Sequence, residues 1–376
     1  MKRYCLWLVW LLSCTFLINA CVEPFSPPEV NSDEGYLVID GFLNVGSDTT
    51  KIELSRTQNA NAVTPVLKES GASVQVEQEN GGTYVFSEIG NGSYILPPQQ
   101  YNRTAKYRLR VKTSRGSEYL SDYVEVKSTP PIDGIEGKID SRQDAMVMQV
   151  NTHDASNQTR FYRWKFEETW EYRAAFYSGL EIVKNASGNG YEIIARKQDV
   201  NLCWRSLKSA NILLGSTIKL SQDIIKDLPL TTVPIASNKL YIKYSILVKQ
   251  YGLTQDAFEY WTSLAKTTEG TGSLFDPLPS QITGNIKSTT RPQELVFGYF
   301  SASIEQKKRV FLTPNLGSYP RCNDPDTLLV SEALTMPGSI LTNYVDPRSQ
   351  AVLTTSSYCA DCRAQGGTIV KPSFWE

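Results

Sequence analysis

The sequence predicts a mainly β protein, in which an N-terminal sandwich of the immunoglobulin or transthyretin type is followed by a larger β-rich domain with one or two short helices. Three observations predict this class. The 376 residues include 20 Tyr, 13 Phe and 7 Trp, and aromatic residues favour strands. Short segments of alternating polar and apolar residues recur from residue 35 onward, with turn residues between them. A clear helical period is confined to residues 253–266.

Residues 1–20 predict an export signal peptide. Lys2 and Arg3 are basic, and residues 4–18 are almost wholly apolar. This apolar stretch is shorter than the roughly 20 residues that a membrane-spanning helix needs.

The end of the signal resembles the recognition sequence of bacterial lipoproteins. Ile18-Asn19-Ala20-Cys21 places a small residue directly before a cysteine, whose thiol would carry the lipid. We therefore expect attachment to the lipid bilayer through an acylated Cys21. The alternative is a plain secretory signal followed by a chance cysteine. Residues 21–34 contain three prolines and four carboxylates, which indicate an extended, solvated tether.

The predicted sandwich occupies residues 35–128. Residues 51–55 and 107–111 alternate as half-buried strands do, and residues 74–77 and 84–86 flank the turn Asn80-Gly81-Gly82, which is a strong hairpin pattern. Thr129-Pro130-Pro131 then interrupts the pattern and marks a domain boundary.

The second predicted domain spans residues 129–376. Strands are expected at residues 146–150, 161–167, 241–249, 295–301 and 309–313. The helix expected over residues 253–266 would be capped by Thr254 and would present Ala257, Trp261 and Leu264 along one stripe. Residues 268–292 are rich in Pro, Gly, Asn and Thr and are expected to form a loop.

Four cysteines remain after Cys21: Cys203, Cys322, Cys359 and Cys362. An even number in an exported chain favours two disulfides, whose pairing the sequence leaves open. The spacing of Cys359 and Cys362 also allows a zinc site formed with the other two cysteines, or a redox pair.

An aromatic run lies between residues 161 and 177. Its Trp164, Trp170, Tyr172 and Tyr177 are candidates for a partner or ligand surface, because Tyr and Trp are enriched at interfaces. The alternative is that the run forms core strands.

The sequence offers little support for catalysis. His153 is the single histidine and lies in a polar stretch between two predicted strands, where an ordinary loop residue is expected. The chain contains neither a Gly-x-Ser-x-Gly elbow nor a phosphate-binding loop, and the neighbours Glu167 and Glu168 would face opposite sides of a strand. Lys and Arg total 38 against 39 for Asp and Glu, which disfavours nucleic acid as a partner. We expect no metal and no cofactor.

Several short motifs stand out along the mature chain. They are Cys21–Phe25, Leu37–Gly41, Leu54–Thr57, Phe161–Trp164, Cys203-Trp204, Ala257–Trp261, Gly284-Asn285-Ile286, Gly298–Ala302, Cys359–Gly367 and Lys371–Trp375. Together they resemble a family of Bacteroidota outer-membrane lipoproteins, the domain of unknown function 4249. The resemblance implies a lipid-anchored companion of a TonB-dependent outer-membrane transporter, and it supplies no catalytic residue.

Two further tripeptides resemble the short O-glycosylation motif of exported Bacteroidota proteins. They are Asp48-Thr49-Thr50 and Asp326-Thr327-Leu328, with Thr49 and Thr327 as the candidate acceptors.

The sequence thus favours a non-catalytic binding or accessory protein, anchored in the outer membrane and associated with a nutrient transporter. It leaves open which face of that membrane the body occupies. A lipid-anchored surface hydrolase of glycans or peptides and a structural or adhesion module are the alternatives. A cleft with converging carboxyl groups of raised pKa would indicate the hydrolase.

Overall fold

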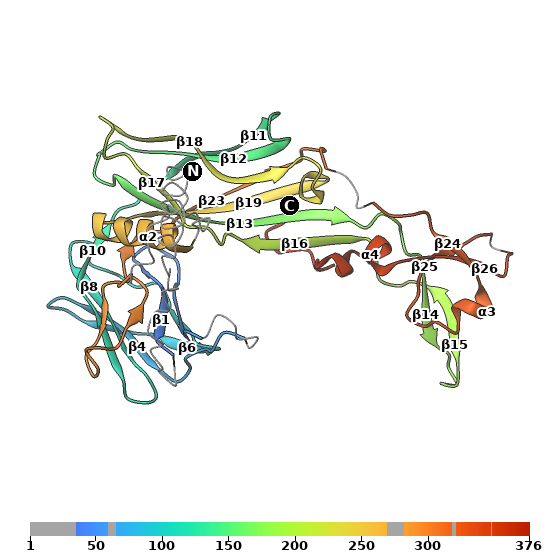
Figure 1. Ribbon diagram of the computed structural model, residues 1–376, viewed down its shortest axis with the longest axis horizontal. Helices are drawn as coiled ribbons and strands as arrows, with labels where there is room; N and C mark the ends of the chain where they lie inside the picture. The colour runs from blue at the N-terminus through green and yellow to red at the C-terminus, as the bar shows by residue number, and fades with distance from the viewer. Residues whose placement is uncertain (1–34, 59–64, 269–281, 318–320, 347) are drawn as a thin grey trace, which may run out of the picture.

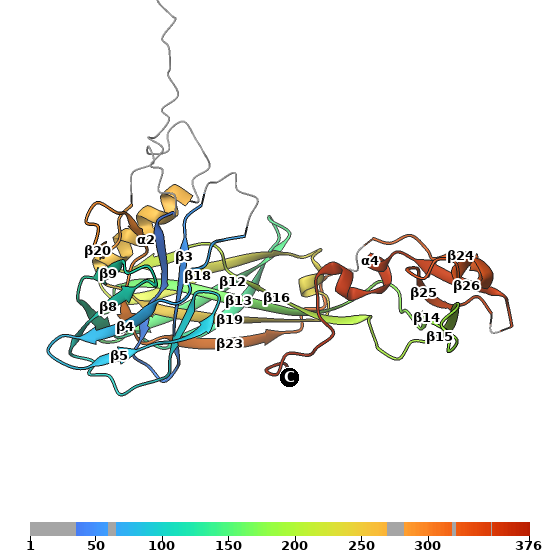
Figure 2. The ribbon, with the colours of Figure 1, turned by 90° about the horizontal axis from the view of Figure 1, so that it is seen from below.

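The computed structural model describes residues 35–376 except 59–64, 269–281, 318–320 and 347. The predicted signal peptide, Cys21 and the tether lie outside these residues. The described chain is mainly β, as predicted, and forms three bodies that we name the sandwich, the central body and the tip. The sandwich and the tip lie at opposite ends of the central body (Figures 1 and 2).

The sandwich consists of two sheets. The first sheet has the order β21 (Val296–Phe297), β1 (Leu37–Gly41), β3 (Thr50–Arg56), β7 (Ser93–Leu96) and β6 (Ser87–Gly90). The second has the order β2 (Leu43–Asn44), β22 (Ala302–Ser303), β10 (Val124–Lys127), β8 (Lys106–Lys112), β4 (Ser73–Gln78) and β5 (Thr83–Val85). In the same sheet, β9 (Glu118–Ser121) pairs with β8, and β20 (Ile286–Ser288) pairs with β9.

The predicted alternation holds in these strands. Tyr107, Leu109 and Val111 of β8 are fully buried, and the polar residues between them are partly exposed. The predicted hairpin is formed by β4 and β5, and Asn80 takes a positive φ of 55° in its turn.

Residues 35–128 do not form the sandwich alone, because β20, β21 and β22 return to it from residues 286–303. β21 pairs in parallel with β1, and β22 pairs in parallel with both β2 and β10. A segment predicted as part of the second domain therefore completes the first. The strand expected at residues 295–301 is reduced to the two residues of β21, and β20 lies in the segment expected to be a loop. These strands have two or three residues each, which is too short for a periodic pattern to show.

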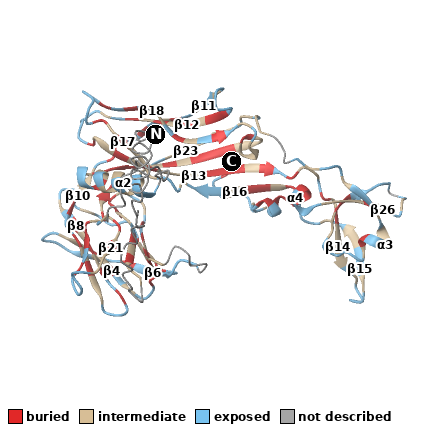
Figure 3. Ribbon diagram, in the orientation of Figure 1, coloured by how far each residue is buried: buried red, intermediate tan, exposed pale blue. Residues whose placement is uncertain are grey.

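The central body also has two sheets. One consists of β11 (Ile132–Asp140), β12 (Ala145–Asp154) and β18 (Asp223–Pro234), and the other has the order β16 (Leu202–Lys208), β13 (Phe161–Arg173), β19 (Lys243–Gly252) and β23 (Gln306–Leu312), with β17 (Leu213–Ser216) also paired to β13. Met148 and Val150 of one sheet share a buried core with Trp164, Ile246 and Val248 of the other. Figure 3 shows this core along β12 and β13.

Helix α2 (Gln255–Thr268) lies where the sandwich meets the central body (Figure 1). The side-chain oxygen of Thr254 accepts a hydrogen bond of 3.2 Å from the amide of Ala257, so Thr254 caps the helix as predicted. Ala257 is fully buried in a junction cluster that includes Phe42 and Tyr251. A short 3-10 helix, η1 (Asn238–Leu240), precedes β19.

The tip comprises residues 176–198 and 324–356. It contains the hairpin of β14 (Leu180–Lys184) and β15 (Tyr191–Ala195), the sheet of β24 (Asp326–Leu329), β26 (Ala351–Thr355) and β25 (Ile340–Tyr344), and helix α3 (Val330–Ala333). Its fully packed core is small, with four buried members: Leu180, Ala333, Leu341 and Val352. Helix α4 (Ser357–Ala360) and the 3-10 helix η2 (Cys362–Gln365) follow, and they lead the chain back to the central body.

Candidate functional site

The four mature cysteines form two disulfides, which join Cys203 to Cys362 and Cys322 to Cys359. The interpretation of the four cysteines as two disulfides is thereby confirmed. The zinc site and the redox pair are not formed. The adjacent Cys359 and Cys362 bond to different partners, since each faces a different segment. Among the described residues there is no group of His, Cys, Asp or Glu arranged to hold a metal ion.

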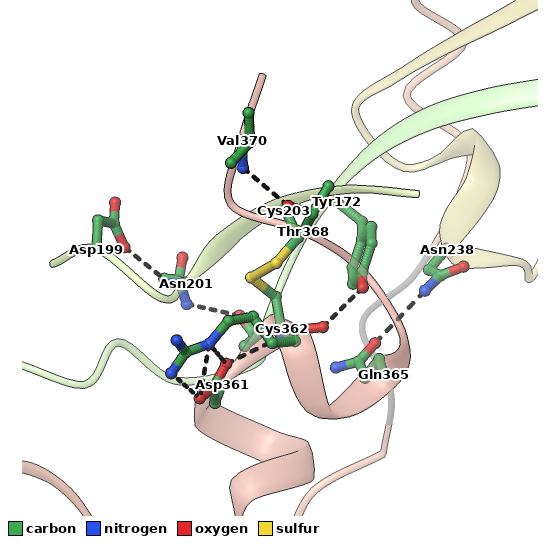
Figure 4. The surroundings of a disulfide bond; sticks show 12 residues. Tyr172, Asp199, Asn201, Cys203, Asn238, Asp361, Cys362, Gln365, Thr368 and Val370 are labelled. Carbon is green, nitrogen blue, oxygen red and sulfur yellow. Dashed lines mark hydrogen bonds and ion pairs between the residues drawn. A yellow bond between two sulfur atoms is a disulfide. The ribbon is translucent and has the colours of Figure 1, made fainter. Parts of the chain in front are cut away.

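The terminal cysteine motif, Cys359–Gly367, holds the C-terminal segment against β13 and β16 (Figure 4). The Tyr172 hydroxyl donates a hydrogen bond of 2.7 Å to the carbonyl of Cys362, and the Asp361 side chain accepts one of 2.9 Å from the amide of Arg363. The Arg363 guanidinium pairs with the same carboxylate, which helps hold the pKa of Asp361 below its ordinary value against burial. This motif therefore has a structural role in joining the tip to the central body.

The candidate aromatic surface is largely core. Trp164, Trp170 and Tyr172 are buried, because their positions in β13 face the opposing sheet or the C-terminal segment. These three residues are corrected to core positions, the alternative that the sequence left open. Tyr177 alone among the four is exposed, at 55%, and it lies where the chain enters the tip.

The tip carries an unusual share of exposed apolar side chains. Among the described residues, six of the nineteen exposed large hydrophobic side chains lie on it, although the tip is the smallest of the three bodies. They are Tyr177, Tyr191, Leu329, Met336, Tyr344 and Val345. Figure 3 shows few buried residues in this body. Exposed apolar side chains that are frequent on one body indicate a surface that binds other proteins, so the tip is the first candidate site.

A cleft at the junction of the sandwich and the central body is the second candidate site. We call it the junction cleft, and its volume is about 640 Å³. It lies between β1, β13 and α2, with the loop of residues 209–212 and the segment around Phe297 completing its wall. A volume of this size is typical of small-molecule sites.

The alternation of β13 positions two cations in this cleft. Tyr162 and Trp164 face the core, so Arg163 and Lys165 face the opposite side of the sheet, toward α2. The guanidinium of Arg163 lies 3.4 Å from the centre of the Trp261 ring. Burial lowers the pKa of Arg163 to about 10, which leaves it charged at neutral pH.

Apolar side chains also line the junction cleft. They are Val38 of β1, Leu264 of α2, Ile282 and Phe297, which are all partly buried. The predicted helix stripe thus serves two purposes, since Ala257 packs into the junction and Trp261 and Leu264 face the cleft. Sequence reasoning missed Arg163 and Lys165, although their alternation with aromatic residues is visible in the sequence.

The remaining sequence candidates do not converge on either site. His153 is exposed and contacts Asp133, with 2.8 Å between Nδ1 and Oδ2. Glu168 is buried and accepts hydrogen bonds from Lys239 and Tyr244, at 2.7 and 2.8 Å, whereas Glu167 lies on the other face of β13.

The two candidate O-glycosylation acceptors, Thr49 and Thr327, are both exposed and lie on different bodies. Thr49 precedes β3 of the sandwich, and Thr327 lies in β24 of the tip.

Comparisons with known proteins give one informative match. The model of the family described as domain of unknown function (DUF4249) matches residues 22–309. Comparison with the curated proteins finds no match. Among the described residues, no helix has both the length and the apolar character to cross a membrane.

Among solved structures, the chitinase ChiA74 from Bacillus thuringiensis is similar over 53% of this chain and 28% of its own, with 11% sequence identity and a TM-score of 0.16. The chain thus spans less than a third of that protein, and so low a TM-score supports no inference about fold or activity.

Proposed function

The chain belongs to the DUF4249 family, and we propose that it is a non-catalytic binding protein, anchored in the outer membrane through an acylated Cys21. In this proposal it assists a TonB-dependent nutrient transporter. The exposed apolar side chains of the tip would contact that transporter, while the tether at the other end of the molecule would lead to the lipid.

The single observation that carries the proposal is the surface of the tip. A body with four buried core residues holds six large exposed apolar side chains, three of which are tyrosines. Tyrosine supplies a large contact area at low conformational cost and is enriched at protein interfaces. The disulfides hold the base of the tip to the central body, which would preorganise this surface for a partner.

The ionisation of the carboxyl groups supports a binding role over a hydrolase. A glycosidase acid needs a carboxyl group of raised pKa beside a second carboxylate. Among the described residues, each carboxyl group with a shifted pKa has it lowered, as hydrogen-bond donors do for Asp154 and basic partners for Glu77 and Asp361.

Affinity purification from native outer membranes tests the proposal. The tip variant replaces Tyr177, Leu329 and Val345 by Ser, and the control variant replaces Ile139, Ile218 and Leu220 of the central body by Ser. The two sets are matched in exposure, at 51–55% and 52–58%. We expect a stoichiometric transporter with the wild type and the control, and its loss with the tip variant.

A wild-type chain that purifies alone would contradict the proposal and favour the adhesion or hydrolase alternatives. A transporter that co-purifies equally with both variants would show that the contact lies outside the tip. Cys21→Ser tests the anchor when it is combined with the tip substitutions, because that chain should leave the membrane fraction while the tip variant with Cys21 intact stays there.

A further inference from the structure

A row of cations crosses the face of the central sheet that borders the junction cleft. Lys165 of β13 lies directly opposite Lys249 of β19, and Lys249 lies directly opposite Lys307 of β23. Arg163 precedes Lys165 by two residues and shares its face. Like charges placed directly opposite one another destabilise a sheet, so this row is a feature that folding alone does not favour.

The cations are unequally neutralised. Lys307 pairs with Asp48 at 2.9 Å and Glu305 at 3.4 Å. Within the described residues Lys165 pairs with Asp40 alone, at 3.7 Å, and that carboxylate is 60% exposed. For Arg163 and Lys249, the described part of the chain provides no ion pair. Positive charge is therefore in excess at the end of the row that opens into the junction cleft.

Arg163 is the most unusual member of the row. Its Nε is buried and has no hydrogen-bond partner among the described residues. Its guanidinium lies against Trp261 in a cation–π contact. A buried charge without an ion-pair partner is costly, and an anion bound beside the guanidinium would reduce that cost. A guanidinium also matches a carboxylate in shape and charge.

The cleft is also lined by apolar side chains. They are Val38, Leu264, Ile282 and Phe297, and the polar groove of about 590 Å³ that adjoins the cleft shares Asp40 and Lys165 with it. A ligand there would meet both positive charge and apolar surface.

We propose that the junction cleft binds an organic acid, whose carboxylate pairs with Arg163 and Lys165 and whose apolar body lies against Phe297 and Leu264. This site is separate from the tip, so the inference goes beyond the proposed function and does not depend on it.

Three probes that separate charge from apolar body test the inference. They are 4-phenylbutyrate, its neutral analogue 4-phenylbutyramide, and acetate, which has the charge without the body. The protein is the mature chain with Cys21→Ser, which lacks only the lipid. Isothermal titration calorimetry should show 4-phenylbutyrate binding about tenfold more tightly than either other probe, as expected for the loss of one charge-assisted contact or one buried ring.

Arg163→Met is the test variant and Arg309→Met the matched control, because the Arg309 guanidinium also lies over an aromatic ring, 3.6 Å from the centre of Phe374, but outside the cleft. The preference for acid over amide should disappear in the first variant and persist in the second. Lys165→Met provides a second test variant if Arg163→Met does not fold, and it should reduce the same preference.

Equal binding of acid and amide, or no measurable binding of the acid, would overturn the inference. A preference that survives both Arg163→Met and Lys165→Met would also overturn it. None of these results affects the purification experiment, so failure here and failure of the proposed function are distinguishable.

Discussion

A side chain at position 367 would collide with residues packed around the disulfide between Cys203 and Cys362. A Cβ on Gly367 would lie 2.2 Å from the Tyr172 hydroxyl and 2.9 Å from Cβ of Cys203. Both neighbours are buried, and Cys203 is bonded to Cys362, so neither can move away easily. The requirement for glycine in the terminal motif is therefore steric.

We predict that Gly367→Ala lowers the free energy of unfolding by about 1–3 kcal/mol, the usual cost of overpacking. Gly338→Ala is the matched control, because a Cβ there meets nothing within 4 Å. Urea denaturation measures both variants. An unchanged midpoint for Gly367→Ala would show that the C-terminal segment is packed less tightly than described.

The protonation of His153 can be followed by itself, because it is the single histidine of the chain. The hydrogen bond to Asp133 raises the pKa of His153 above its ordinary value of 6.5. The raised pKa means that the pair stabilises the fold below about pH 6.5 and that this contribution is lost as the pH rises through the folded pKa. We predict one NMR imidazole signal that titrates above pH 6.5 and whose pKa is lower in Asp133→Asn than in the wild type. A wild-type signal at or below 6.5 would contradict the contact.

At the scale of elements, one asparagine secures the segment that returns to the sandwich. The Asn285 side chain donates to the carbonyl of Phe300 and accepts from its amide, each at 2.8 Å. The asparagine thus satisfies both backbone groups of Phe300, as a neighbouring strand would, in the segment that contains β20, β21 and β22. The neighbouring Gly284 packs against the backbone of Gly298, where a Cβ would lie 1.7 Å from the carbonyl oxygen.

We predict that Asn285→Ala destabilises the chain by about 1–3 kcal/mol, because both backbone groups of Phe300 lose a buried partner. Asn343→Ala, at an exposed position of β25, should stay within about 0.5 kcal/mol of the wild type. Thermal denaturation compares the two. Equal melting temperatures would show that the returning segment is held by its strand pairing alone.

The two disulfides should contribute unequally. Cys203–Cys362 joins residues 159 apart, and Cys322–Cys359 joins residues 37 apart. The chain-entropy model gives about 5 kcal/mol for the longer loop and about 4 kcal/mol for the shorter one. We predict that replacing the first pair by Ser lowers the denaturation midpoint more than replacing the second. The reverse order would indicate that the tip governs the stability of the whole chain.

The long elements were predictable from the sequence because their burial alternates over many residues. The strands β3, β8, β12, β13 and β19 and the helix α2 lie where the pattern placed them. The strand expected at residues 295–301 is only the short β21, and β20 and β22 were not predicted, because two or three residues define no period. The partners of all three strands are more than 150 residues away. The sequence also left open how the four cysteines pair, because the partners are distant along the chain.

At the scale of the whole molecule, the candidate sites lie far apart. The tip projects from one end of the central body, and α2 and β1, which line the junction cleft, lie near the other end (Figures 1 and 2). Residues 21–34 can span at most about 50 Å when extended. In the proposed function, this tether lets a molecule anchored at the sandwich end present its tip to a neighbour in the same membrane.

The candidate sites were less predictable than the fold. The aromatic run was visible, but whether a tryptophan faces a core or a solvent depends on which sheet covers it. The cations of the junction cleft were also visible, yet only the packing of α2 and β1 against β13 shows that Arg163 and Lys165 share a cleft.

Photo-crosslinking from single positions in native membranes tests the central claim most directly. A benzoylphenylalanine at Tyr344 of the tip, 38% exposed, is compared with one at Tyr123 of the sandwich, 36% exposed. We predict a crosslink from position 344 to a TonB-dependent transporter and none from position 123. A transporter crosslinked only from Tyr123, or from neither position, would contradict the claim that the tip is the contact surface.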